Sequence, residues 1–131
     1  MELARNTNKP EEQLYDLSLI DKMCRGNQKQ IERMIHAFIS QTSESIEDLK
    51  LAGSKNDLLK MKAIVHKIKP AFTYYGTYKL EKEVKILESL ILGEYEMFLL
   101  DLKINTVAKL ATQIILKMKN DFNITTNENE Q

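Results

Sequence analysis

Four long segments of this chain carry apolar residues three and four positions apart, and this spacing constrains the fold more than any other feature. At 3.6 residues per turn, such a series lines one side of an α-helix. The stripes are Ile31, Met34 or Ile35, Phe38, Thr42, Ile46 and Leu49; Leu58, Met61, Val65, Ile68, Phe72 and Tyr75; Leu80, Val84, Leu87 and Leu90 with Ile91; and Met97, Leu100, Ile104, Val107, Ala111, Ile114 or Ile115, Met118 and Phe122. The sequence therefore predicts an all-α protein.

Turn and capping residues separate these segments. A short helix is expected over 16–25, and long helices over about 27–53, 56–75, the segment between Gly76 and Gly93, and 94–122, with Asn27 and Asn56 as caps. Short connections allow amphipathic helices to bury their stripes together only when neighbours run antiparallel. We expect an antiparallel up-down four-helix bundle with a short additional N-terminal helix over 14–122. Residues 1–13 are expected to form a flexible arm, and residues 123–131 a disordered tail.

The composition excludes several classes of function. Lysine plus arginine equals aspartate plus glutamate at 19 each, so no overall field attracts nucleic acid or an anionic membrane. Residues 1–10 lack the apolar core of a signal peptide, and no apolar run is long enough to span a bilayer. We expect a cytoplasmic monomer, and the initial Met with the polar tail favours a complete chain. The single cysteine, Cys24, is expected to be a packing residue.

The stripe from Leu58 to Tyr75, in the third predicted helix, predicts where His66 points. At about 100° per residue, His66 lies about 135° from the centre of that stripe and should face water. Lys62 and Pro70 lie one turn before and after it, and Lys69 lies three residues on. The result is a surface suited to anions, although an exposed histidine near lysines is often only solvated surface.

The motif His-Lys-Ile-Lys at 66–69, followed by Gly76 and Leu80, resembles the signature of the histidine-containing phosphotransfer (HPt) domain family, H-x-[LI]-K-G with a later glycine and leucine. The likeness extends to the short helix before Gly26, to the phenylalanine at the centre of the long second helix, and to the Leu-Glu pair at 87–88. It covers about 14–122. The resemblance implies a helical bundle that carries phosphoryl groups in a two-component phosphorelay.

If the resemblance holds, His66 accepts a phosphoryl group from an aspartate of one receiver domain and passes it to another receiver. Lys69 matches the family's lysine and would balance charge on the phosphoryl oxygens, with a weaker contribution from Lys67. The partners implied are receiver domains of response regulators or hybrid histidine kinases. The protein would have no independent catalytic activity and no cofactor of its own, because the receiver brings the Mg²⁺.

We expect the partner to dock around His66. The residues assigned to this docking surface are Lys62, Ala63, Ile64, Pro70, Ala71, Thr73 and Gly76. Pro70 departs from the family, which has glycine there. A proline inside a helix costs about 3 kcal/mol. Because the stripe stays in phase across it, we predict a kinked but continuous helix in which His66 stays exposed.

A helical bundle is also compatible with two other functions. One is a bundle with an interaction role only, or a silent HPt relative that binds a receiver without transfer. The other is a di-iron bundle, which needs Glu-x-x-His pairs, whereas Arg33 and Ala63 stand three residues before His36 and His66. No metal site is therefore expected, and His36 is interpreted as a boundary residue. The chain has no G-x-G-x-x-G or Walker-type loop, so nucleotide binding is not expected.

Overall fold

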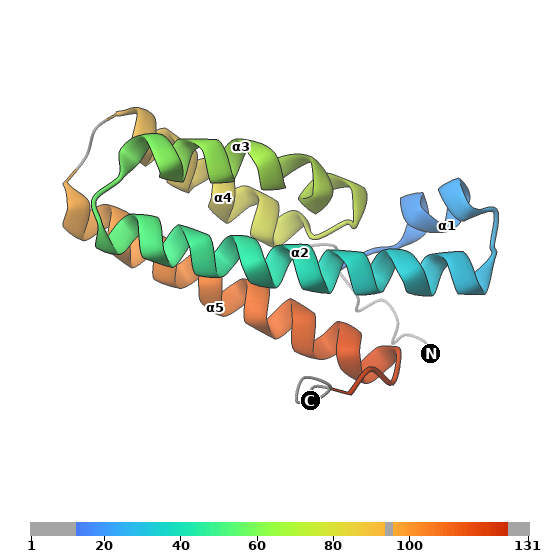
Figure 1. Cartoon of the computed structure of the whole chain (residues 1–131). Coiled ribbons are helices and arrows are strands. Elements are labelled where there is room, and N and C mark those ends of the chain that lie inside the picture. Colours follow the sequence, from blue (N-terminus) through green and yellow to red (C-terminus); the bar gives the residue numbers. More distant parts are fainter. Residues whose placement is uncertain (1–12, 94–95, 126–131) are drawn as a thin grey trace, which may run out of the picture.

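The structure is a computed structural model that describes residues 13–93 and 96–125, and within this part of the chain all regular structure is helical (Figure 1). The helices are α1 (Ser18–Cys24), α2 (Gln28–Ser54), α3 (Leu58–Tyr74), α4 (Tyr78–Leu92) and α5 (Met97–Asp121). The predicted all-α class is confirmed. None of the described helices is long and apolar enough to cross a membrane.

The four long helices form an antiparallel bundle. α2 packs against α3 and α5, and α4 packs against the same two helices, so each long helix has two neighbours. α2 and α5, with 27 and 25 residues, extend past α3 and α4, with 17 and 15. The short α1 packs on α2 at this extended end (Figure 1). The predicted bundle with a short additional N-terminal helix is confirmed.

The buried stripes set how each helix is rotated about its axis. In α3, Met61, Val65 and Phe72 are completely buried. The Phe72 ring packs edge-on against Phe38 of α2, with ring centroids 6.1 Å apart, and Phe38 lies 4.6 Å from the ring of Tyr75. Burying an aromatic side chain stabilises a fold by about 1.5–3 kcal/mol. This aromatic cluster therefore holds α3 with its opposite side toward solvent.

Two helix N-termini are capped by side chains. Asn27 accepts a hydrogen bond from the Gln30 N–H at the start of α2, as predicted. The cap of α3 is Asp57, which accepts from the Lys60 N–H, so the predicted cap at Asn56 is wrong by one residue. Asn56 instead takes the left-handed conformation, with φ of 54°, in the turn after α2.

The chain ends are described only in part. Residues 1–12 of the predicted arm and 126–131 of the predicted tail lie outside the described residues. Just before that boundary, Ile124 is partly buried against the core, and its N–H donates to the Lys119 carbonyl at 2.8 Å. The first residues after α5 therefore continue along the surface of the bundle.

The segment before α1 contacts both the α3–α4 turn and the C-terminal end of α5. The Asp16 N–H donates to the Tyr75 carbonyl at 3.3 Å, which places this segment against the α3–α4 turn. The Tyr15 hydroxyl donates to the Asp121 carboxylate at the end of α5, and Lys117 pairs with the same carboxylate at 2.9 Å. The N-terminal segment is thus held by both the turn and α5.

Tyr15 should make the stability of the fold sensitive to alkaline pH. Burial, followed by the hydrogen bond to Asp121, raises the pKa of Tyr15 above its ordinary value near 10. A raised pKa in the folded state contributes stability below about pH 10, and that stability is lost as the pH rises further. Urea unfolding at pH 7 to 11 should show the wild type losing stability more steeply above pH 10 than Tyr15→Phe.

The Tyr15→Phe variant keeps every other tyrosine, including Tyr75, whose pKa is also raised by burial. The difference between the two proteins therefore isolates Tyr15. Parallel stability curves above pH 10 would contradict the interpretation.

Candidate functional site

His66 lies near the middle of α3, on the side away from the core. Its neighbour Val65 is completely buried, and Ile68 is 6% exposed, whereas His66 is exposed. This is the orientation that the phase of the apolar stripe predicted. The imidazole makes no hydrogen bond or ion pair with any residue in 13–93 or 96–125. A group approaching from solvent therefore meets no competing contact from these residues at either ring nitrogen.

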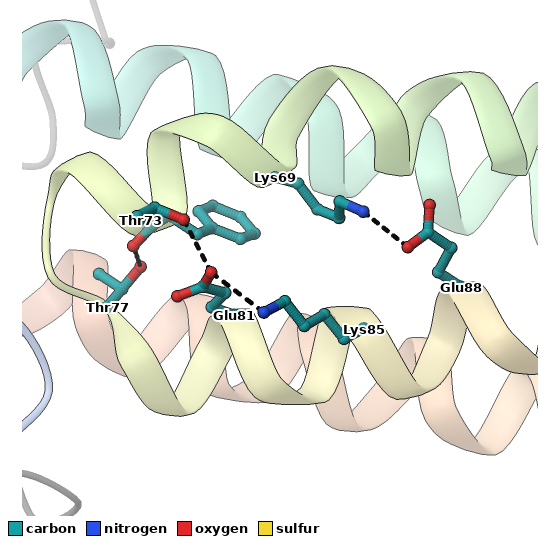
Figure 2. A network of polar contacts seen from close by, with 7 residues as sticks. Lys69, Thr73, Thr77, Glu81, Lys85 and Glu88 are labelled. Atoms are coloured by element: carbon teal, nitrogen blue, oxygen red, sulfur yellow. Dashed lines mark hydrogen bonds and ion pairs between the residues drawn. The ribbon is translucent and has the colours of Figure 1, made fainter.

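The two lysines of the motif turn to opposite sides of His66. Lys67 borders a cavity of about 70 Å³ between α2 and α3, whose lining includes Gln41 and Ser45. Lys69 extends to the other side, where its Nζ lies 2.7 Å from Oε1 of Glu88 on α4 (Figure 2). Lys62 and Lys67 have no ion-pair partner among the described residues. His66 thus stands between two unpaired lysines and one paired lysine.

A second polar contact joins α3 to α4 next to the Lys69–Glu88 pair. The Thr73 hydroxyl donates to Oε2 of Glu81 at 2.7 Å, and Lys85 lies 3.5 Å from the same oxygen (Figure 2). The sequence indicates only the part of this arrangement that lies within each helix. Lys69 and Thr73 are one turn apart on α3, and Glu81 and Glu88 are two turns apart on α4, so each pair lies on one side of its helix.

The predicted docking surface is only partly exposed. Lys62, Ala63, Pro70 and Thr73 are exposed, and Ala71 is half-buried. Ile64 and Gly76 are buried, so their assignment to this surface is corrected. Ile64 lies two residues before His66, which places it on nearly the opposite side of a helix.

Gly76 has a structural role at the turn between α3 and α4. Its φ is +65°, a conformation that L residues with a side chain rarely adopt. A Cβ at this position would lie 2.1 Å from the carbonyl oxygen of Asp16 and 2.7 Å from the Asp16 nitrogen. Gly76 therefore lets the N-terminal segment cross directly over the turn.

Pro70 lies inside α3, which continues without a break from Leu58 to Tyr74, as predicted. Because proline has no N–H, the His66 carbonyl, four residues before it, has no helical donor at this position. The ring is exposed one turn from His66. Pro70 thus changes both the backbone and the outer surface beside the histidine.

Metal binding finds no support at this site or elsewhere in the described part of the chain. Residues 13–93 and 96–125 contain no group of three or more histidine, cysteine, aspartate or glutamate side chains placed to hold a metal ion. Cys24 is buried, as expected for a packing residue, and its Sγ lies 3.5 Å from Sδ of Met34. His36 is exposed on α2.

Comparisons with known proteins bear on the fold. No protein-family model matches the sequence, and no curated protein matches it. A solved structure does match: the HPt domain of a sensor hybrid histidine kinase from Shewanella, with a TM-score of 0.70 and 16% sequence identity. The alignment covers 90% of this chain and 99% of that domain. The chain therefore has the fold of an HPt domain.

Proposed function

We propose that this protein is a histidine phosphotransfer protein of a two-component phosphorelay, in which His66 accepts a phosphoryl group from one receiver domain and passes it to another. The observation that carries the proposal is an exposed histidine, free of contacts with the described residues, in the middle of α3 of a bundle with the HPt fold. The fold alone does not determine function, whereas the chemistry of an exposed histidine such as His66 bears on it directly.

A neutral imidazole is a suitable acceptor for a phosphoryl group. Histidine has a reference pKa near 6.5, so a large share of such side chains is neutral at physiological pH. The lone pair of one ring nitrogen attacks the phosphorus of a receiver's aspartyl phosphate. A P–N bond forms while the P–O bond breaks, and its electron pair leaves on the aspartate carboxylate. The other ring nitrogen keeps its proton, giving a phosphoimidazolium that can release it to solvent.

This transfer needs open space in line with the attacking nitrogen, and exposure of His66 provides it. The side chains on the exposed part of the predicted surface are short or cationic: Lys62, Ala63, Pro70 and Thr73. A receiver brings an acidic phosphorylation site with its Mg²⁺, and unpaired lysines would favour its approach. We propose that the protein acts as a cytoplasmic monomer that carries the group without catalysing a reaction alone.

Transfer from a phosphorylated receiver tests the proposal. Purified receiver domains carrying ³²P would be incubated with the wild type and with His66→Gln. We expect label on the wild type, stable in base and lost in acid as a P–N bond requires, and none on His66→Gln. His36→Gln is the matched control, because His36 is also exposed on a long helix and should keep the label. Both substitutions should change the free energy of unfolding by less than about 0.5 kcal/mol.

Two outcomes would overturn the proposal. Label that persists on His66→Gln would show that another residue accepts the group. A wild type that binds a receiver but acquires label neither from it nor from phosphoramidate would instead support a bundle that binds receivers without transfer. Calorimetric titration with unphosphorylated receiver distinguishes binding without transfer from no binding.

A further inference from the structure

Lys69, the residue assigned to the phosphoryl group, already has a partner. Its ammonium lies 2.7 Å from Glu88, and the two side chains are 31% and 25% exposed (Figure 2). The pair joins α3 to α4 and is partly shielded from water. Any group on His66 that attracts Lys69 must therefore compete with the Glu88 carboxylate.

A phosphoryl group on His66 would be such a competitor. It brings negative charge and three acceptor oxygens to a position one turn from Lys69 on the same side of α3. A lysine side chain is flexible and carries three donors, so it can turn from a carboxylate to a phosphoryl group without movement of the backbone. When Lys69 turns away, Glu88 remains as a carboxylate without its partner near a new anion.

We infer that Glu88 is a positioning residue that competes with the phosphoryl group for Lys69, makes phosphorylated His66 less stable and so favours onward transfer. The inference depends on the proposed phosphotransfer function of His66. In the unphosphorylated protein, Glu88 holds Lys69 toward α4. In the phosphorylated protein, Lys69 is shared between two anions, and the phosphoryl group receives only part of its charge. If Glu88 were neutral, the Lys69 ammonium would interact with the phosphoryl group without a competing carboxylate.

The size of the effect follows from the exposure of the pair. The loss of a partly exposed ion pair changes an equilibrium constant by up to about fivefold. For Glu88→Gln, we expect the equilibrium of phosphoryl transfer between a receiver and this protein to shift toward phosphorylated His66 by about two- to fivefold. Glutamine keeps the length of the side chain and an acceptor oxygen, so the variant removes mainly the charge.

The chain offers a closely matched control. Glu83, also on α4, pairs with Lys103 of α5 at 2.7 Å, with side chains 21% and 23% exposed, respectively. Glu83→Gln breaks an interhelical ion pair of the same length and similar exposure, but on the side of α4 that faces α5. This control substitution should lower the free energy of unfolding by about as much as Glu88→Gln does, and it should leave the transfer equilibrium unchanged.

The experiment measures the ratio of phosphorylated receiver to phosphorylated His66 at equilibrium for the wild type, Glu88→Gln and Glu83→Gln, and for Glu88→Gln with Lys69→Met. We expect a shift for Glu88→Gln alone and no effect of that substitution once Lys69 is methionine. Equal ratios for the two glutamate variants would overturn the inference. Label on His66 in the same experiment would still support the proposed function. A shift that persists without Lys69 would also overturn it, because Glu88 would then act on the phosphoryl group directly.

A second measurement needs no receiver. The wild type would be phosphorylated on His66 with phosphoramidate, a small phosphoryl donor, and the ¹⁵N signal of the Lys69 ammonium compared before and after. We expect the signal to move when His66 is phosphorylated, and to move again when Glu88 is replaced by glutamine. A signal unaffected by phosphorylation would overturn the competition for Lys69 even if transfer to His66 takes place.

Discussion

Replacing Gly76 by alanine is expected to lower the free energy of unfolding by about 2–5 kcal/mol, combining strain in the left-handed conformation with a steric clash. The Cβ would lie 2.1 Å from the Asp16 carbonyl oxygen, a distance that no real contact of this kind reaches. The obstacle is backbone, so rotation of a side chain cannot relieve it. The N-terminal segment or the α3–α4 turn must move, and urea unfolding followed by circular dichroism would measure the loss.

Gly26→Ala is the matched control for this experiment. Gly26 also has a positive φ, of +75°, but apart from its own chain neighbours no atom of the described residues lies within 4 Å of the position of its Cβ. Alanine there should cost only the strain of the left-handed conformation, about 1–2 kcal/mol. The difference between the two variants measures the contact with Asp16. Equal losses would show that the N-terminal segment does not press on the turn.

The role of Gly76 also explains why it is not part of the docking surface. A glycine ten residues after the histidine belongs to the motif that resembles the HPt signature, and Gly76 was grouped with the predicted surface as a residue of that motif. In the structure it is buried beneath Asp16 at the end of α3. It therefore supports the turn that ends α3 and positions α4, and its effect on the site is indirect.

The orientation of His66 could be predicted because it depends on one helix alone. The helical repeat places Val65, Ile68 and Phe72 on one side whatever surrounds them, and the opposite side must then face solvent. The position of the α3 cap was less certain for a local reason. Asn56 and Asp57 are adjacent residues of types that both favour N-caps, and only the backbone conformation distinguishes them.

The partner of Lys69 could not be predicted in the same way. It depends on which helix lies beside α3 and how far that helix is shifted along its axis. The spacing of Lys69 and Thr73 places them on one side of α3, but it does not say that Glu88 and Glu81 of α4 face them. The assignment of Ile64 to the surface had a different cause, because it followed closeness in sequence to His66 rather than the helical phase.

Pro70 is the second position where a substitution should have a large effect. It lies in the interior of α3, and its ring is exposed. Because it has no N–H, it cannot donate a hydrogen bond to the His66 carbonyl. Alanine would restore the hydrogen bond and remove the steric pressure of the ring, at little loss of packing. A proline inside a helix lowers the free energy of unfolding by about 3 kcal/mol. Because it also restricts the unfolded chain, it raises that free energy by about 0.4–1 kcal/mol. Pro70→Ala should therefore raise the free energy of unfolding by about 2 kcal/mol.

Glycine at the same position separates stability from access to His66. Pro70→Gly also restores the hydrogen bond, but glycine is less favourable in a helix than alanine by about 1 kcal/mol, so the gain in stability should be smaller. It leaves the most open space beside the imidazole. If the proline ring hinders an incoming receiver, the transfer rate should increase from proline to alanine to glycine, while stability is highest for alanine. Equal rates in the three proteins would show that the ring lies outside the receiver's path, and a loss of stability in Pro70→Ala would contradict the strain assigned to α3.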